Sequence, residues 1–384
     1  MSPDPRAAAG PVRVAHVTSV HEAHDVRIFH KECRSLAQAG YEVSLFAPGD
    51  HDETLDGVRI HVVPPPRSRF ERVARTTPRV ALAALRSNAR VIHLHDPELL
   101  PWGLLFKLVG RHVIYDAHEN LPKDIRTKHY LPMWLRRLLA AVADLAERTC
   151  CACFDGVITV TPGIAVRFAS RRTVVVRNYP RLEELPAGDA PPYAARRPIA
   201  LYLGGLSVIR GAREMVQAIG RVNGSVPPEL WLAGRFDPPP LEADLSRDSG
   251  WARTVRLGWR SREQVRAALD QARIGLLVLH PAPNHLDSLP IKLFEYMGAG
   301  LPVVASDFAA WREVLGEGGL YVDPLDVGAI AGAIQWLLAH PQEAERMGRV
   351  GQAAVTRELH WEREARTLLR LYERVAGPAR ATAS

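Results

Sequence analysis

The stretch VRVAHVTSVHEAHDVRIFHKECRSLAQAGYEVSLFAP, residues 12–48, decides the fold. It opens on an apolar run, 12–20, and closes on a second one, 41–48, and each is predicted to be a buried strand. Between them, residues 25–40 carry an apolar stripe at helical spacing, with Asp25 placed to cap the start of a helix and Gly40 to cap its end. The stripe consists of Ile28, Phe29, Cys33, Leu36 and Ala37. Two nearly continuous Val/Ile/Leu runs joined by a helix indicate a parallel sheet with both faces covered.

Similar apolar runs recur along the whole chain, separated by predicted helices. In the first half they are 58–64, 89–97, 112–120, 154–162 and 173–180. In the second half they are 199–206, 228–236, 254–260, 273–281, 301–307 and 318–324. Between the two series, around 179–198, the composition turns to Pro, Ala and charged residues, which is typical of a linker. The predicted fold is therefore α/β, with two Rossmann-like, doubly wound parallel-sheet domains facing each other across a cleft.

The length and composition agree with two soluble globular domains. The chain has 384 residues, of which 47% are hydrophobic and 24% charged. No apolar run approaches the roughly 18 residues of a membrane span, and the N-terminus lacks the apolar core of a secretory signal, so we expect a cytoplasmic protein. The four cysteines make no disulfide framework in a chain this long. The CCAC cluster at 150–153 is read as buried small side chains, with a metal site as the alternative.

The net charge of +7 and pI near 9.4 favour polyanionic or phosphorylated partners. Residues 67–90 hold seven arginines and one glutamate. Aromatic residues do not alternate with these arginines as they do in single-strand binders, so we expect no nucleic-acid partner. The segment is either a solvated helical face or a contact to an anionic membrane surface. Residues 131–148, which place Trp134 beside Arg136 and Arg137, either bind the membrane interface or pack on the sheet.

In doubly wound sheets, ligands bind outside the carboxyl ends of the strands. The candidate segments are 18–27, 95–98, 116–120, 204–211, 234–237, 259–260 and 280–295. Each of the two predicted domains has one such edge, so each can bind one end of a ligand. This arrangement suits a ligand whose two ends differ chemically.

The stretch DSLPIKLFEYMGAGLPVVASD, residues 287–307, gives the most specific signal. Ser288 is predicted to cap a helix, with Pro290 in its first turn, so that the amides of Leu289 to Ile291 form an anion site. Asp287 precedes this site, and Glu295 lies roughly 10 Å into the helix. A diphosphate on the helix start would direct one substituent to each carboxylate, as in a nucleotide-sugar. Alternatively, Asp287 stabilises the helix dipole and Glu295 pairs with Lys292.

This stretch resembles the signature of the retaining glycosyltransferases of family 4, which have the GT-B fold: a carboxylate, seven residues, a glutamate, then A-x-G-x-P-V-V-A-S. The resemblance extends over most of the chain. HDVRIFHKECRSLAQAGYEV is similar to the first strand–helix–strand of many bacterial members, and YLGGLSVIRG is similar to their phosphate loop. It implies an acceptor-binding domain at 1–180, a linker at 181–198, and a nucleotide-sugar-binding domain at 199–358. A helix at 359–376 would cross back to the first domain, ahead of a disordered tail at 377–384.

By this resemblance, Asp287 contacts the donor hexose and acts in catalysis, and Glu295 contacts the ribose. The diphosphate would meet the amides beside Pro290 and the loop of Gly204, Gly205 and Arg210. Gly205 stands where the family usually has an arginine, so Lys292 or Arg27 is expected to compensate. The remaining donor-binding candidates are Ser288, Leu289, Ile291, Gly234, Arg235, Trp259 and Arg260.

On the acceptor side, His118 matches a family histidine at the junction of acceptor and donor and is predicted to be catalytic, with Glu119 orienting its ring. Arg27, His95 and Asp96 lie at strand ends of the same domain and are predicted to bind the acceptor. No metal is expected, since the Asp-x-Asp motif of the other glycosyltransferase fold is missing, and no cofactor is expected, because the nucleotide-sugar is a substrate. Retention of configuration is implied by the family alone.

The predicted function is transfer of a hexose or N-acetylhexosamine from a nucleotide-diphosphate sugar, UDP-linked on family frequency. The acceptor would be a glycan, lipid-linked or small molecule, in cell-envelope or exopolysaccharide synthesis at the inner face of the membrane. Two alternatives stay open. One is a nucleotide-sugar 2-epimerase or hydrolase on the same fold, and the other is a non-catalytic polyanion-binding protein. The missing G-x-G-x-x-G fingerprint argues against a dehydrogenase.

Overall fold

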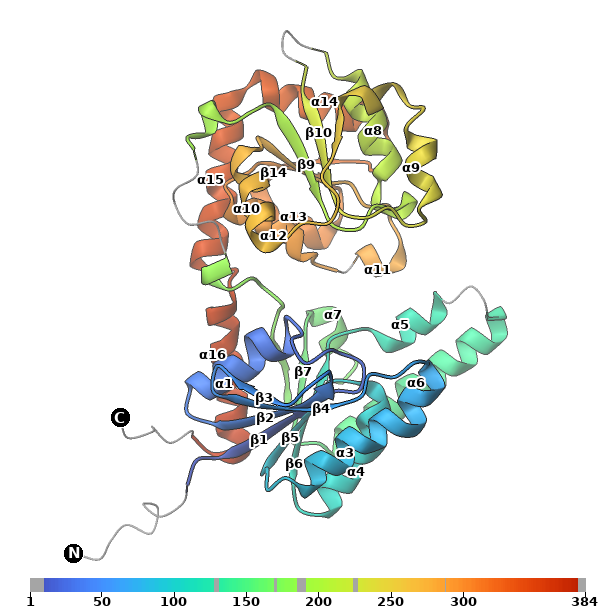
Figure 1. Cartoon of the computed structure of the whole chain (residues 1–384), viewed down its shortest axis with the longest axis vertical. Helices are drawn as coiled ribbons and strands as arrows, with labels where there is room; N and C mark the ends of the chain where they lie inside the picture. The colour runs from blue at the N-terminus through green and yellow to red at the C-terminus, as the bar shows by residue number, and fades with distance from the viewer. Residues whose placement is uncertain are drawn as a thin grey trace, which may run out of the picture. The chain divides into compact units, whose positions relative to one another are not determined.

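A computed structural model describes residues 10–127, 131–168, 171–184, 191–223, 227–286 and 288–378. The chain divides into two compact units: Met1–Asn178 with Trp361–Ser384, and Tyr179–His360. Each unit is built on one sheet (Figure 1). No helix of the described part is both long and apolar enough to cross a bilayer.

The first unit contains an eight-stranded sheet in the order β3-β4-β2-β1-β5-β6-β7-β8. Its strands are β1 (Arg13–Val17), β2 (Glu42–Pro48), β3 (Glu53–Leu55), β4 (Val58–Val63), β5 (Val91–Leu94), β6 (His112–Ala117), β7 (Gly156–Thr159) and β8 (Thr173–Val175). The strand–helix–strand predicted for residues 12–48 is confirmed, because β1 pairs in parallel with β2 from Arg13↔Glu42 onward.

Helices cover both faces of this sheet. They are η2 (Ile28–Cys33), α1 (Arg34–Gln38), α2 (Arg69–Glu71), η3 (Arg72–Thr76), α3 (Thr77–Arg86), η4 (Pro97–Leu99), α4 (Leu100–Leu108), α5 (Leu121–Arg126), α6 (Met133–Cys153), α7 (Pro162–Ala165) and α16 (Trp361–Ala376). One core joins η2, α1 and α16 to the sheet, and another joins α3, α4 and α6 to its other face (Figure 1). The predicted caps are both present: the Asp25 carboxylate accepts from the amides of Arg27 and Ile28, and Gly40 has φ 91°.

The sequence analysis did not predict the antiparallel strand β3. It pairs with β4 through Glu53↔Ile60 and Leu55↔Val58. Asp56 and Gly57 connect the two strands with φ values of 51° and 77°, which is the conformation that an Asp-Gly hairpin turn requires. The Asp56-Gly57 pair was therefore the sequence feature that could have predicted this hairpin.

The second unit contains a six-stranded, wholly parallel sheet in the order β11-β10-β9-β12-β13-β14. Its strands are β9 (Ile199–Leu203), β10 (Glu229–Ala233), β11 (Thr254–Arg256), β12 (Ile274–Leu277), β13 (Val303–Ser306) and β14 (Gly319–Val322). Its longer helices are α8 (Ala212–Arg221), α9 (Pro240–Leu245), α10 (Arg262–Gln271), α12 (Ile291–Gly298), α13 (Ala309–Leu315), α14 (Val327–Ala339) and α15 (Pro341–Arg357). The shorter ones are η5 (Leu182–Glu184), η6 (Tyr193–Ala195), η7 (Val208–Arg210), η8 (Ser249–Arg253), α11 (Pro283–Leu286) and η9 (Gly316–Gly318). Both faces of the sheet are again covered by apolar cores.

The domain boundaries differ in detail from those predicted. Within the predicted linker, 181–198, residues 185–190 lie outside the described ranges, but Tyr193 is buried in the core of the second unit. Its hydroxyl donates to the Arg273 carbonyl at 3.0 Å, and Arg196 donates to the Ala299 carbonyl at 3.1 Å. Residues 191–198 are thus part of the second domain, because a buried tyrosine and two long-range hydrogen bonds hold them there. The first unit resumes at Trp361 with helix α16.

The CCAC cluster lies at the end of α6. All four cysteines of the chain are free, and only Cys33 and Cys151 are buried. Within the described ranges, no group of side chains that could hold a metal includes a cysteine.

Candidate active site

Two loops meet at the carboxyl end of the second sheet, one after β9 and one after β10. The Gly204 amide donates to the Ala233 carbonyl at 2.8 Å, and the Leu206 amide donates to the Arg235 carbonyl at 2.9 Å. Gly234 has φ 158°, and a Cβ there would lie 2.0 Å from the Gly204 carbonyl oxygen. The two loops therefore lie backbone against backbone, which only glycine permits at Gly234.

Two cations flank the Gly204–Gly205 backbone. The Lys292 ammonium, on the first turn of α12, lies 2.9 Å from the Tyr202 hydroxyl and 4.1 Å above the centre of that ring. A Cβ on Gly204 would lie 2.8 Å from the Lys292 ammonium, and one on Gly205 would lie 3.0 Å from the Arg210 guanidinium. The absence of side chains at both glycines thus leaves room for the two cations to converge on one short stretch of backbone.

The electrostatics of this cluster favour an anion. Burial and, to a lesser extent, the positive charge of Arg210 together lower the pKa of Lys292 to about 7, although Glu295 opposes the shift. Two neighbouring like charges are unfavourable in the free protein. An anion that lies between them would remove this repulsion, so the arrangement is suited to a phosphate or diphosphate.

The start of α12 differs from the prediction. The helix begins at Ile291 with Pro290 as its N-cap, and Ser288 makes no cap. Instead, the Ser288 hydroxyl donates to the His285 carbonyl at 3.3 Å, and its carbonyl accepts from the Trp311 indole at 2.7 Å. The capping role of Ser288 was wrong because these contacts hold it two residues ahead of the N-cap, Pro290. Leu293 already donates to the Pro290 carbonyl, so the amides ahead of it in the first turn are those of Ile291 and Lys292.

The other predicted donor-binding residues differ in how exposed they are. Asp287 lies outside the described residues, and Glu295 is half-buried on the second turn of α12. Leu289 packs partly buried against the core. Arg260 is half-buried, whereas Arg235 is exposed and Trp259 is 70% exposed, so Trp259 is no core residue. The pairing of Asp287 and Glu295 with the two rings of a donor stays a prediction.

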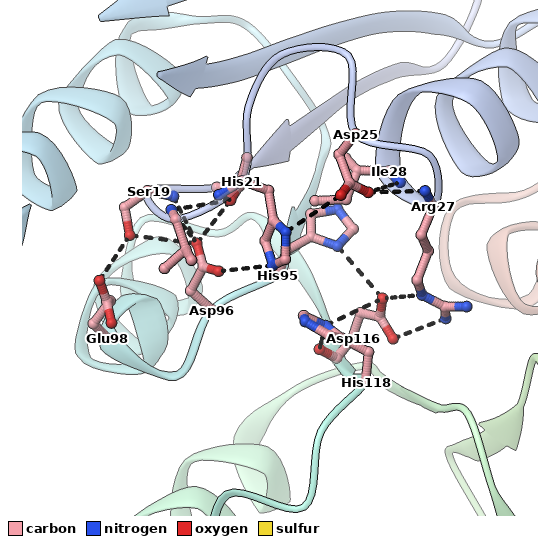
Figure 2. Close-up of polar contacts among 12 residues, drawn as sticks. Ser19, His21, Asp25, Arg27, Ile28, His95, Asp96, Glu98, Asp116 and His118 are labelled. Carbon is pink, nitrogen blue, oxygen red and sulfur yellow. Dashed lines mark hydrogen bonds and ion pairs between the residues drawn. The ribbon is translucent and has the colours of Figure 1, made fainter. Parts of the chain in front are cut away.

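In the first unit, the carboxyl ends of β1, β5 and β6 carry a polar network centred on Asp116 (Figure 2). The Arg27 guanidinium donates to both carboxylate oxygens of Asp116, at 2.7 and 3.0 Å. His95 lies 3.5 Å and His118 3.8 Å from the same carboxylate. Burial alone would raise the pKa of Asp116, but the Arg27 charge holds it well below its usual range. Asp116 is therefore a permanent buried anion that orients three side chains.

This network changes the interpretation of Arg27 and His95. Arg27 is only 6% exposed and His95 is fully buried, so neither presents a surface to a ligand in the first unit. Arg27 is also no free cation for a diphosphate, because Asp116 occupies its guanidinium. The predicted direct contact of Arg27 and His95 with an acceptor is therefore replaced by a positioning role. Both side chains hold Asp116 beside His118.

Asp96 is likewise not an open acceptor contact, since it is 1% exposed. One of its carboxylate oxygens accepts from the Thr18 hydroxyl at 2.9 Å and from the Ser19 amide at 2.6 Å. It therefore fixes the loop that follows β1. Local sequence did not show this, because the donors lie more than seventy positions away.

His21, in the loop between β1 and η2, is a residue that the sequence prediction did not single out. Its ring nitrogens lie 3.4 Å from Asp25 and 3.7 Å from Asp96, and its ring meets His118 edge-on at 5.0 Å (Figure 2). Burial alone would lower the pKa of His21, but Asp25, Asp96 and the exposed Glu119 raise it. The available signal was the spacing of His21 and Asp25, four residues apart in a strand-end loop. His21 and His118, both half-buried, form the accessible part of this network.

Both domains of the chain match known protein families. Residues 197–340 match the family of glycosyl transferases group 1, and residues 26–179 match the glycosyl transferase 4-like domain. The chain is 40% identical over 304 residues to a phosphatidyl-myo-inositol mannosyltransferase of Mycobacterium tuberculosis, covering 75% of this chain and 74% of that protein. It is 26% identical over 395 residues to a glycogen synthase of the same species, covering 90% of each.

Solved structures show the same fold. Sucrose-phosphate synthase from Thermosynechococcus elongatus superposes with a TM-score of 0.74 at 20% identity, covering 94% of this chain and 98% of that one. HepE from Anabaena, solved with UDP and glucose, superposes with a TM-score of 0.68 at 13% identity, covering 94% and 98%. With its two parallel sheets and these relatives, the chain belongs to the bacterial glycosyltransferases of the family-4 type, on the GT-B fold.

Proposed function

We propose that this glycosyltransferase moves a hexose or N-acetylhexosamine from a UDP-linked donor to a glycan, lipid-linked or small-molecule acceptor, with retention of configuration. The observation that carries the proposal is the convergence of Lys292 and Arg210 on the Gly204–Gly205 backbone, beside the start of α12. The structure of HepE with UDP and glucose, on the same fold, supports a donor of this class.

On the donor side, Lys292 takes the place of the arginine that Gly205 replaces. Its ammonium and the Arg210 guanidinium neutralise the diphosphate as the sugar leaves, together with the amides of Ile291 and Lys292, so that the leaving group needs no divalent ion. Asp287 contacts the sugar and Glu295 the ribose, and Trp259 and Arg260 lie toward the base.

On the acceptor side, His118 and His21 present imidazoles at the strand ends of the first unit. Asp116 sets the orientation of His118, and Asp25 and Asp96 favour a charged His21. A cationic imidazole next to a half-buried one suits an acceptor hydroxyl that lies near a phosphate, as in a lipid-linked acceptor. The relative named phosphatidyl-myo-inositol mannosyltransferase supports this acceptor class.

Helix α6 supports binding at the inner face of the cell membrane. Its exposed apolar residues include Trp134, Leu138, Val142 and Leu145, which follow one another at helical spacing. Arg136 and Arg137 lie beside them in the sequence. On α2 and η3, exposed Phe70 and Arg75 add a further apolar and a further basic side chain. An apolar stripe with flanking arginines is the composition of an interfacial helix on anionic lipid. The proposed enzyme is thus a peripheral membrane protein that acts in cell-envelope synthesis.

The test is calorimetry of the full chain with UDP, GDP and ADP, followed by product analysis with the matching sugar nucleotide. We expect micromolar binding of UDP and sugar transfer only when an acceptor is present. Preferential binding of GDP or ADP would correct the donor base. Release of a free sugar or of a 2-epimer without acceptor would indicate a hydrolase or epimerase, and salt-sensitive DNA binding with no response to nucleotides would contradict the proposal.

A further inference from the structure

Three histidines and a glutamate form a buried cluster inside the first unit, away from the Lys292 site of the second. His16 lies on β1, His93 and His95 on and just after β5, and Glu32 on η2. All four are fully buried, and each offers one ligand atom within 4.8 Å of the others. His16 and His93 are register partners on neighbouring strands, and His95 follows on the same face two residues later.

The distances suit a small tetrahedral site. His16 Nδ1 and His95 Nε2 are 2.9 Å apart, and His93 Nδ1 lies 3.7 Å from Glu32 Oε2. In a tetrahedral zinc site with bonds of about 2.0–2.1 Å, neighbouring ligand atoms are about 3.3 Å apart. The two observed separations lie on either side of this value, and all four ligand atoms lie within 4.8 Å of one another, so inward shifts of the side chains would complete the geometry.

The hydrogen bonds of the cluster leave several buried polar atoms without partners. The Tyr372 hydroxyl of α16 lies 2.8 Å from His93 Nδ1 and 3.3 Å from His16 Nε2. Within the described residues, both carboxylate oxygens of Glu32, His93 Nε2 and His95 Nδ1 nevertheless make no hydrogen bond, although Arg27 forms an ion pair with Glu32 Oε1 at 3.1 Å and Asp116 lies 3.5 Å from His95 Nδ1. Buried polar atoms in native proteins are nearly always satisfied, so the two remaining atoms, Glu32 Oε2 and His93 Nε2, point to a missing group.

The charged side chains around the cluster indicate what kind of group is missing. Arg27 contacts both buried carboxylates, Asp116 and Glu32: it is bidentate to Asp116 and lies 3.1 Å from Glu32. The neighbouring Lys31 directs its ammonium to the Asn178 side chain at 2.7 Å. Lys31 is fully buried as well, so Arg27 and Lys31 together can balance Asp116 and Glu32. Glu32 Oε2 lies 3.7 Å from His93 Nδ1, and a cation between these two atoms would take both as ligands.

We propose that His16, His93, His95 and Glu32 hold a resident divalent transition-metal ion of the Zn²⁺ type that ties η2 to the carboxyl ends of β1 and β5. Imidazole nitrogens with one carboxylate suit this class of ion. Asp116, 3.5 Å from His95 Nδ1, is placed to accept the proton of the nitrogen that faces away from the metal, which is the usual partner of a metal-bound histidine. The ion is structural, since the four ligands close the site and leave no solvent-exposed position.

The test uses the full-length chain, purified through a tag without histidines and loaded with Zn²⁺ or Co²⁺ alone. We expect about one equivalent of metal per chain by elemental mass spectrometry, a visible cobalt spectrum, and X-ray absorption that shows imidazole ligation. Removing the metal with a chelator should lower the thermal midpoint of the first unit, and Zn²⁺ should restore it.

Matched variants locate the ion. Glu32→Gln and His93→Gln should weaken metal binding at least about tenfold, whereas His61→Gln, on the exposed part of β4 in the same sheet, should leave it unchanged. Wild-type protein that takes up neither Zn²⁺ nor Co²⁺ overturns the proposal, and so does wild-type stoichiometry in both cluster variants. Should the variants not fold, the cobalt and absorption spectra of the wild type decide by themselves, because a site without imidazole ligation contradicts the assignment.

Discussion

At the scale of single residues, the position of the Lys292 ammonium sets its ionic state. It lies over the Tyr202 ring and beside Arg210, so that burial and a like charge hold its pKa at about 7. In the unfolded chain its pKa is near the ordinary value of about 10.4. Between these two values the unfolded chain binds more protons, so the contribution of Lys292 to stability increases as the pH rises from 7 and is least favourable below it.

The first prediction concerns binding to Lys292. A bound diphosphate stabilises the charged ammonium, so UDP binding takes up a proton and UDP affinity should decrease as the pH rises above 7. Lys292→Met should weaken UDP binding by about 1.5–3 kcal/mol and remove this pH dependence. It should also raise the free energy of unfolding at pH 7 and below. Calorimetry and urea unfolding across pH measure both effects.

The matched control is Lys123→Met on α5, which should bind UDP like the wild type. Lys292→Arg should retain most of the affinity but lose the pH dependence, since an arginine stays charged. Equal UDP affinity in wild type and Lys292→Met would remove Lys292 from the donor site.

The second prediction concerns the two carboxylates of the family motif, Asp287 and Glu295. Glu295→Ala should weaken UDP binding by about 1–3 kcal/mol, because a hydrogen bond from the ribose to a charged group is lost. Asp287→Asn should leave UDP affinity unchanged and lower kcat, because its proposed partner is the sugar. Unchanged affinity in Glu295→Ala, or normal turnover in Asp287→Asn, would contradict the respective role.

The third prediction concerns Arg27 and Asp116. Arg27→Met leaves a buried carboxylate unpaired and should lower the free energy of unfolding by about 3–5 kcal/mol. Arg13→Met breaks a half-exposed pair with Glu42 on the same sheet and should cost less than about 1 kcal/mol. Urea unfolding compares the two, and a loss of similar size in both variants would mean that the buried pair has no special weight.

At the scale of elements, α6 is a 21-residue helix with few buried residues. The prediction for residues 131–148 left two alternatives, and exposure of Trp134 and Leu138 rules out packing of this stripe on the sheet. The arginine-rich segment 67–90 is different, because Arg72 donates to Glu98 at 2.6 Å and is partly structural. Its exposed arginines, such as Arg75, are the ones available to a membrane.

The fourth prediction tests α6. Replacing Trp134 and Leu138 together by Ser should lower the affinity for phosphatidylglycerol vesicles at least about tenfold, because each apolar side chain contributes about 1.5–3 kcal/mol when it leaves water. Leu108→Ser, on the equally exposed end of α4, is the control. Vesicle sedimentation measures both, and unchanged binding in the double variant would leave α6 without a membrane role.

At the scale of the whole molecule, the last helix belongs to the first domain. Trp361 is fully buried there, and its indole donates to the Ser35 hydroxyl at 2.8 Å. The Glu364 carboxylate accepts from the Arg177 amide at 2.7 Å. The first domain is therefore complete only when the end of the chain has been made.

The fifth prediction follows from this arrangement. Trp361→Ala should lower the stability of the first domain by about 3–5 kcal/mol. Trp336→Ala, on the partly exposed face of α14, should cost less and act on the second domain. Domain-resolved hydrogen exchange distinguishes the two. Protection in the first domain that survives Trp361→Ala would show that α16 is dispensable.

The sequence by itself determined the alternation of strands and helices in both domains, the caps at Asp25 and Gly40, and the membership of the family. These features depend on short-range periodicity and on the conformations that single residues allow, both of which are visible along the chain. Gly204 and Gly234, in the loops after β9 and β10, belong to the same class, because their positive φ values are required by the backbone itself.

Only the tertiary structure decided which polar residues at the strand ends are accessible. Arg27 and Asp116 are 89 positions apart, and nothing local shows that each is the partner of the other. The same holds for Lys292 and Tyr202, which are 90 positions apart, and for the His16–Glu32–His93–His95 cluster. The physical reason is that the burial and charge of a side chain depend on groups that only the folded sheet brings together, whereas sequence periodicity reports only which face of an element is apolar.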